Sequence, residues 1–144
     1  MIYLGIDYGS KRIGIACSDE MGITADPVCI ITSDSKDKIW QELIKVINEN
    51  RASTVVVGLP RRTTGEIGVE AQAVFGFVEE LKKRVSVDVL TWDERFTSQE
   101  ADRLMREADL SIKKRKEKRD AIAAKIMLQS FLDYQRMKDS SCTN

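Results

Sequence analysis

Acidic residues at three places in the chain could carry hydrolytic chemistry: Asp7, the adjacent pair Asp93 and Glu94, and Asp120. The chain contains no histidine, which excludes Ser-His-Asp and Cys-His catalysis, histidine general bases and histidine-bearing zinc sites. Acid–base chemistry must therefore use carboxylates, lysines or metal-bound water. Carboxylates from three separate elements suit Mg²⁺ or Mn²⁺. Two such ions about 3.5–4 Å apart could activate water and stabilise the leaving oxygen of a phosphodiester.

Asp7 lies at the rim of a predicted β-hairpin near the N-terminus. The turn residues Gly9 and Ser10 separate an apolar run that ends at Asp7 from a second apolar run. Because side chains alternate along a strand, we expect Asp7 on the face that also carries Tyr3 and Gly5. The alternative is that Asp7 and the Gly9-Ser10 pair are ordinary turn residues with no ligand.

Asp120 begins the apolar stripe of the last predicted helix. Ala124, Met127, Phe131 and Tyr134 follow it at helical spacing. A carboxylate on a stripe that faces the core is costly unless it is paired, solvated at the rim or bound to a cation. The alternative role is compensation of the helix dipole, which an aspartate in the first turn supplies.

A basic segment, residues 113–119, directly precedes Asp120. It carries six positive charges and one negative charge, so the rest of a chain with zero net charge sums to −5. Positive charge is the wrong sign for a helix start. A partner that carries phosphates would meet this segment first. The alternative is that the segment is only a solvated surface. The predicted nucleic-acid-binding residues are Lys113, Lys114, Arg115 and Lys116, together with Lys11, Arg12, Arg61, Arg62, Arg95 and Thr97.

The periodicity of apolar residues predicts the elements that position these side chains. After the hairpin, strands are expected at 27–32, 54–58 and 85–92, and helices at 35–50, at about 71–84, at about 97–108 and from 120 onward. Arg61 and Arg62 follow the buried strand 54–58, where open α/β sheets bind ligands, although a solvated loop is by itself the better explanation. Thr97 fits a helix N-cap as well as a contact to nucleic acid.

The composition indicates one soluble globular α/β domain. Of the 144 residues, 42% are apolar and 32% are charged, and no apolar stretch approaches the length of a membrane span. We therefore expect a single nuclease domain over 1–138, a flexible tail over 139–144 and a cytoplasmic location. Cys17, Cys29 and Cys142 lie far apart, so buried or free thiols are expected in place of disulfides or zinc ligands.

Four stretches of the chain resemble the motifs of the YqgF/RuvX family, which comprises Holliday junction resolvases and pre-16S rRNA nucleases. They are 5–16, 57–60, 93–98 and 120–129. The resemblance implies a ribonuclease H-like fold, a mixed five-stranded sheet of order 3-2-1-4-5 with helices on both faces. It also implies a metal-binding triad of Asp7, Glu94 and Asp120, with Glu94 preferred over Asp93 by the motif alone. One departure is Thr64, where the family usually has an aspartate before the glycine.

By this resemblance the protein is expected to be a nuclease dependent on Mg²⁺ or Mn²⁺, acting on the 5′ end of pre-16S rRNA. The alternatives are resolution of branched DNA and a non-catalytic nucleic-acid-binding module. Sugar kinases and actin-like ATPases share the first motif, but they clamp the nucleotide between two copies of the fold, and 144 residues supply one. The choice between RNA and DNA, between exo- and endonuclease, and between monomer and homodimer stays open.

Overall fold

The structure is a computed structural model that describes residues 1–9, 12–59, 69–93 and 112–142; at 69–70, 112–120 and 139–142 it describes the backbone alone. The strands are β1 (Tyr3–Tyr8), β2 (Ile13–Ser18), β3 (Ala25–Ile31), β4 (Thr54–Leu59) and β5 (Asp88–Asp93). The helices are α1 (Lys36–Glu49), α2 (Val69–Arg84) and α4 (Ile112–Cys142).

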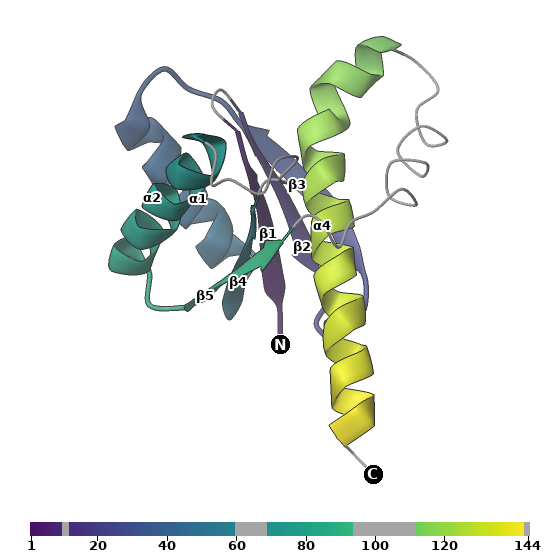
Figure 1. Cartoon of the computed structure of the whole chain (residues 1–144). Helices are drawn as coiled ribbons and strands as arrows, with labels where there is room; N and C mark the ends of the chain where they lie inside the picture. The colour runs from purple at the N-terminus through teal and green to yellow at the C-terminus, as the bar shows by residue number, and fades with distance from the viewer. Residues whose placement is uncertain (10–11, 60–68, 94–111, 143–144) are drawn as a thin grey trace.

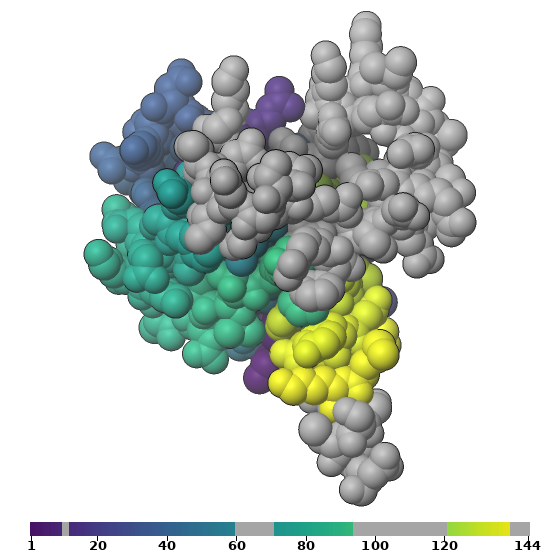
Figure 2. Space-filling view, in the orientation of Figure 1, coloured from purple at the N-terminus to yellow at the C-terminus, as the bar shows by residue number. Residues whose placement is uncertain are grey.

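The strands form one five-stranded mixed sheet of order β3-β2-β1-β4-β5. The pairs β1–β2 and β2–β3 are antiparallel, whereas β1–β4 and β4–β5 are parallel. Helices α1 and α2 cover one face, and α4 crosses the other (Figure 1). In the surface view of Figure 2, the C-terminal part of α4 is the yellow region and α2 lies in the teal region. The predicted fold class, sheet order and helices on both faces are confirmed. The carboxyl ends of β1, β4 and β5 meet at one edge of this sheet.

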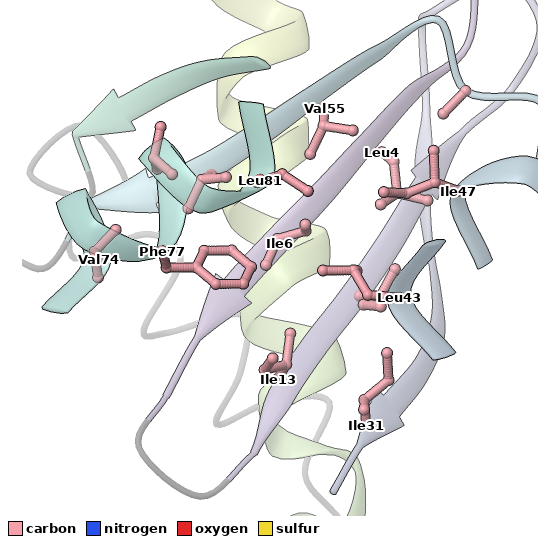
Figure 3. Close-up of a cluster of buried hydrophobic side chains, with 14 residues drawn as sticks. Leu4, Ile6, Ile13, Ile31, Leu43, Ile47, Val55, Val74, Phe77 and Leu81 are labelled. Carbon is pink, nitrogen blue, oxygen red and sulfur yellow. The ribbon is translucent and has the colours of Figure 1, made fainter. Parts of the chain in front are cut away.

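The larger core lies between the sheet and the α1–α2 layer. Leu4 and Ile6 of β1 are completely buried there, and Val55 and Val57 of β4 join them. Helices α1 and α2 close this core with Leu43, Ile47, Val74, Phe77 and Leu81, seen in Figure 3. Residues of even number in β1 therefore face α1 and α2, which leaves the odd ones for α4, as the alternation predicted.

The second core lies under α4, which approaches β1 closely at Gly5. A Cβ atom added to Gly5 would lie 2.8 Å from Cβ of Leu128, so only glycine fits without a shift of the helix. The ring of Phe131 packs edge-on against Tyr3, with centroids 5.6 Å apart. Gln129 fixes the helix laterally, since its Oε1 accepts from the Ala25 backbone (2.9 Å) and its Nε2 donates to the Ile23 carbonyl (2.8 Å).

Two element boundaries differ from the predicted ones for local reasons. The third strand begins at Ala25, with Pro27 inside it and not at its start. Proline is tolerated because β3 is an edge strand whose pairing with β2 shifts by one residue between Ile15 and Ala16. The strand predicted at 85–92 is β5, which begins only at Asp88.

The last helix also starts earlier than predicted. Asp120 does not begin it, because α4 starts at Ile112 and includes the basic segment 113–119. The charged run has no apolar stripe, so periodicity alone could not include it. At the other end α4 continues to Cys142, into the segment expected as a tail. None of the described helices is long and apolar enough to cross a membrane.

The contact between Gly5 and Leu128 leads to a stability prediction. Gly5→Ala should lower the free energy of unfolding by about 1–3 kcal/mol, because the new methyl group overpacks the β1–α4 contact. Gly76→Ala is the matched control: a Cβ there meets no atom within 4 Å, and alanine favours the helix by up to about 1 kcal/mol. Urea unfolding measures both. Equal stabilities of the two variants would contradict the close contact.

Candidate metal site at the carboxyl edge of the sheet

Asp7 lies near the carboxyl end of β1, the middle strand of the sheet, and is half-buried. It shares its face with Tyr3 and Gly5, which contact Phe131 and Leu128 of α4. Alternation therefore places Asp7 on the α4 face. This confirms the predicted sharing of a face among the odd residues of β1 and puts a hard oxygen donor between the sheet edge and α4.

Glycines occupy the positions on either side of Asp7 in the sheet. On β2 its register partner is Gly14. On β4 the position one step beyond the Ile6–Val57 pair is Gly58. Neither of these two neighbours carries a side chain that could crowd the carboxylate. A hydrated divalent cation needs this kind of space, because it keeps several water ligands of its own.

Asp93 is the last residue of β5 and reaches the same edge of the sheet, but alternation places it on the opposite face. Its neighbour Trp92 packs against Phe131 of α4, with ring centroids 5.5 Å apart. Asp93 pairs in register with Leu59, which packs against the α1–α2 core. Strand β4 separates β1 from β5, so the backbones of Asp7 and Asp93 lie roughly 10 Å apart.

The next residue, Glu94, lies outside the described part of the chain. Asp93 itself lies on the face of the sheet opposite Asp7. This is a structural reason, independent of any motif, for preferring Glu94 to Asp93 as a partner of Asp7. The preference remains a prediction.

Asp120 belongs to α4, and its position along the helix can be derived from the backbone. The contacts Tyr3–Phe131 and Gly5–Leu128 show that α4 runs antiparallel to β1. From Tyr3 to Asp7 the strand advances about 13 Å, and a helix covers that length in about nine residues. Counted from Phe131, the level of Asp7 therefore falls about nine residues earlier in α4. Counted from Gly5 and Leu128, the level of Asp7 falls about four residues before Leu128, so Asp120 lies about one helical turn beyond the level of Asp7, toward the rim of the sheet.

Among the described residues there is no cluster of three acidic or cysteine side chains that could hold a metal ion. The side chains of Glu94 and Asp120 lie outside the described part of the structure. The part of the site that is described fits a divalent cation: a half-buried carboxylate at the end of a central strand, flanked by glycines.

Of the predicted nucleic-acid-binding residues, Arg12 lies in the described chain and is exposed at the amino end of β2. Gly9 closes the hairpin beside it by donating to the Arg12 carbonyl (2.9 Å), and a Cβ at Gly9 would lie 2.7 Å from that oxygen. Lys113, Lys114, Arg115 and Lys116 form part of the α4 backbone, whereas Lys11, Arg61, Arg62, Arg95 and Thr97 lie outside the described residues, as does the helix predicted at about 97–108.

The thiols of Cys17 and Cys29 are free and half-buried, in agreement with the prediction; the side chain of Cys142 is not described. Burial raises the pKa of Cys17, although a hydrogen bond to the Ser18 backbone opposes the shift. Burial, and then the charge of Glu42, raise the pKa of Cys29. Both thiols are therefore poor nucleophiles at neutral pH.

Sequence reasoning missed the residues that hold α4 in place over the site. Gln129 joins α4 to the start of β3, and Ser130 accepts from Nε1 of Trp92 (3.3 Å). These bonds join elements that are distant in sequence. Both residues lie off the apolar stripe of the helix, so periodicity gave no signal for them.

A central strand that ends in an acid, a mixed sheet of order 3-2-1-4-5 and a long helix across one face define the ribonuclease H-like fold. The family model for RuvX, described as Holliday junction resolvase, matches residues 1–134. The chain therefore belongs to the RuvX family.

Curated relatives agree with this membership. A protein of Thermoanaerobacter pseudethanolicus is 41% identical over 139 residues (96% of this chain, 100% of the relative), and one of Clostridium acetobutylicum is 41% identical over 133 residues (92% and 98%). Both bear the name "Putative pre-16S rRNA nuclease".

Among solved structures, Thermus thermophilus RuvC in complex with a Holliday junction substrate has a TM-score of 0.62 at 15% identity, covering 95% of this chain and 96% of that one. The fowlpox virus Holliday junction resolvase has a TM-score of 0.56 at 13% identity, covering 94% and 99%. These two likenesses establish the fold.

Proposed function

We propose that this protein is a divalent-metal-dependent nuclease that trims the 5′ end of pre-16S rRNA in the cytoplasm. The observation that carries the proposal is the placement of Asp7, a half-buried acid on the α4 face of the central strand, level with the stretch of α4 that contains Asp120. Membership of the RuvX family and the names of the relatives support the substrate.

Asp7, Glu94 and Asp120 would hold the metal, Mg²⁺ or Mn²⁺ and by the chemistry of phosphodiester cleavage a pair of ions. When bound, such ions supply activation of water and stabilisation of the leaving oxygen. The residues of this chain contribute by fixing the position of the metal ligands. Asp7 is fixed by the central strand, and Gly14 and Gly58 leave room for a phosphate backbone to approach that carboxylate.

Resolution of Holliday junctions is the second candidate, favoured by the description of the family model. A junction carries two strands to be cut, so this activity requires two active sites and hence a homodimer.

One experiment decides between the two functions. The protein is incubated with Mg²⁺ or Mn²⁺ and, in parallel, with a 16S precursor transcript and a synthetic four-way junction. Cleavage of the transcript at its 5′ extension supports the first function, and paired nicks in the junction support the second. Cleavage of neither substrate would refute both.

The basic segment at the start of α4 is proposed to hold the nucleic-acid backbone beside the metal site. Because α4 includes this segment, glutamine is the suitable neutral replacement, since it preserves helix propensity. Replacing Lys113, Lys114, Arg115 and Lys116 with glutamine should weaken binding of all sequences alike. The log–log salt dependence should flatten by about 0.7 per lost contact on a single strand.

Fluorescence anisotropy at several salt concentrations measures this slope. Lys82 and Lys83, in the last turn of α2, provide the control, because α2 covers the opposite face of the sheet. The double glutamine variant there should keep the original slope. If the quadruple variant also keeps it, the segment is a solvated surface, and nucleic acid enters elsewhere.

A further inference from the structure

A cavity of about 430 Å³ lies on the face of the sheet opposite Asp7, between the hairpin, α1 and α2. Tyr8 and Gly9, which line it, directly follow Asp7 in the chain. Tyr8 packs against the α1–α2 core, whereas Asp7 lies on the α4 face. The end of β1 therefore lies between the cavity and the proposed metal site. Its volume lies in the range of small-molecule sites.

One wall of the cavity is aromatic. The ring of Phe77 stacks with that of Tyr8 (centroids 4.3 Å apart, planes at 22°) and with that of Trp40 (5.1 Å, 18°). Arg84 extends this column, with its guanidinium carbon 4.7 Å from the centroid of the Trp40 ring. Phe77 is enclosed, as Figure 3 shows for its ring over Ile6, whereas Tyr8 and Trp40 are only half-buried. Because Phe77 and Arg84 cover the two faces of Trp40, and Phe77 covers one face of Tyr8, the column can offer ring edges to the cavity, and ring edges contact a flat aromatic ligand edge-to-face.

Charged groups line the rest of the cavity. Arg12 and Lys36 contribute positive charge, and Lys36 is the first residue of α1, whose N-terminal end itself favours anions. Asp37 and Glu80 contribute carboxylates. Glu80 already accepts a hydrogen bond from Nε of Arg84 through one oxygen (2.9 Å), and carboxylate oxygens have further capacity to accept from amino groups. An aromatic wall, hydrogen-bond acceptors and a cationic end together match a nucleobase joined to a phosphate.

Gly76 provides open space beside the aromatic wall. It lies inside α2, where glycine is less stable than alanine, and a Cβ atom there would meet nothing within 4 Å. Packing therefore does not require glycine at this position. A large side chain here would project into the cavity without disturbing the core, which makes position 76 suitable for a blocking substitution.

We propose that the cavity holds one unpaired nucleotide of the substrate strand, with its base against the ring edges of Tyr8 and Trp40 and its phosphate toward Arg12 and Lys36. The inference rests on the proposed function, because it places the neighbouring phosphodiester across the sheet edge at Asp7. A base can enter such a cavity only when it is out of a duplex. The enzyme should accordingly prefer single-stranded or splayed substrates.

The fluorescence of Trp40 reports occupation of the cavity. The chain has two tryptophans, so in a Trp92→Phe background Trp40 is the single one. Without divalent metal, an oligoadenylate should quench it, and an abasic oligomer of equal length should not. Quenching by AMP alone, without quenching by the oligomer, would overturn the assignment to the substrate strand and identify a free nucleotide as the ligand. Quenching by neither would overturn the site.

Gly76→Leu in the same background should weaken quenching by oligoadenylate at least about tenfold while the melting temperature stays the same or rises. Glu79→Leu, an exposed position on α2 outside the cavity lining, is the control and should bind like the parent. Undiminished quenching in Gly76→Leu would refute the proposal. Asp7→Asn should keep the quenching of Trp40 while it loses cleavage. The quenching therefore tests nucleotide binding in the cavity, and cleavage tests the nuclease assignment separately.

Discussion

Asp7→Asn is expected to reduce cleavage of nucleic acid about 1,000-fold, which corresponds to about 4 kcal/mol of transition-state stabilisation. Asparagine keeps the size of the side chain but removes the charge of the donor that lies on the α4 face of β1. Because the carboxylate is half-buried at a rim and contributes little packing, the fold should survive. Initial rates with saturating Mg²⁺ or Mn²⁺ measure the loss.

Asp26→Asn provides the matched control, since the same change falls on an exposed position of the edge strand β3. It should cleave at the original rate. Thermal unfolding adds a second comparison: metal at a hundredfold excess over its dissociation constant should stabilise the original protein by about 2.7 kcal/mol and Asp7→Asn by much less. Full cleavage by Asp7→Asn at ordinary metal concentrations would remove this residue from the site.

The pair Asp93 and Glu94 gives the second large effect. Glu94→Gln should lose cleavage about as completely as Asp7→Asn, whereas Asp93→Asn should retain most of it. Asp93 pairs with Leu59 on the face of the α1–α2 core, across the sheet from Asp7. A carboxylate there cannot share a small cation with one on the α4 face without reversing the alternation of the strand.

The two single variants act as controls for each other, because they remove one charge each at adjacent positions. Cleavage with Mg²⁺ and with Mn²⁺, together with metal-induced shifts of the melting temperature, should rank them in the same order. If Asp93→Asn alone is inactive, the side chains at the end of β5 do not alternate between the two faces of the sheet. The metal-binding triad must then include Asp93.

The orientation of Asp7 could be predicted from sequence because β1 is a central strand. Leu4 and Ile6 are fully buried on one face, so the alternation is unambiguous and leaves the odd residues for the other. The sheet order, in contrast, came from the family resemblance. The apolar runs predicted where strands lie, but not which strands are neighbours.

The orientation of Asp93 could not be predicted, because β5 is an edge strand. Its apolar residues do not alternate cleanly with polar ones: Leu90 is 40% exposed and Val89 is only partly buried. What identifies the two faces is the contact of Trp92 with Phe131, between residues that are distant in the chain. The cavity could not be predicted either, because its wall combines one ring each from β1, α1 and α2, which are distant in the chain.

The central claim is that the metal lies on the α4 face at the end of β1. Anomalous diffraction from crystals soaked in Mn²⁺ tests it most directly, with Asp7→Asn crystals as the reference. We expect a peak about 2.0–2.3 Å from a carboxylate oxygen of Asp7, between β1 and α4, and no peak there in the variant. A peak beside Asp93 on the α1–α2 face, or an unchanged peak in Asp7→Asn, would contradict the account.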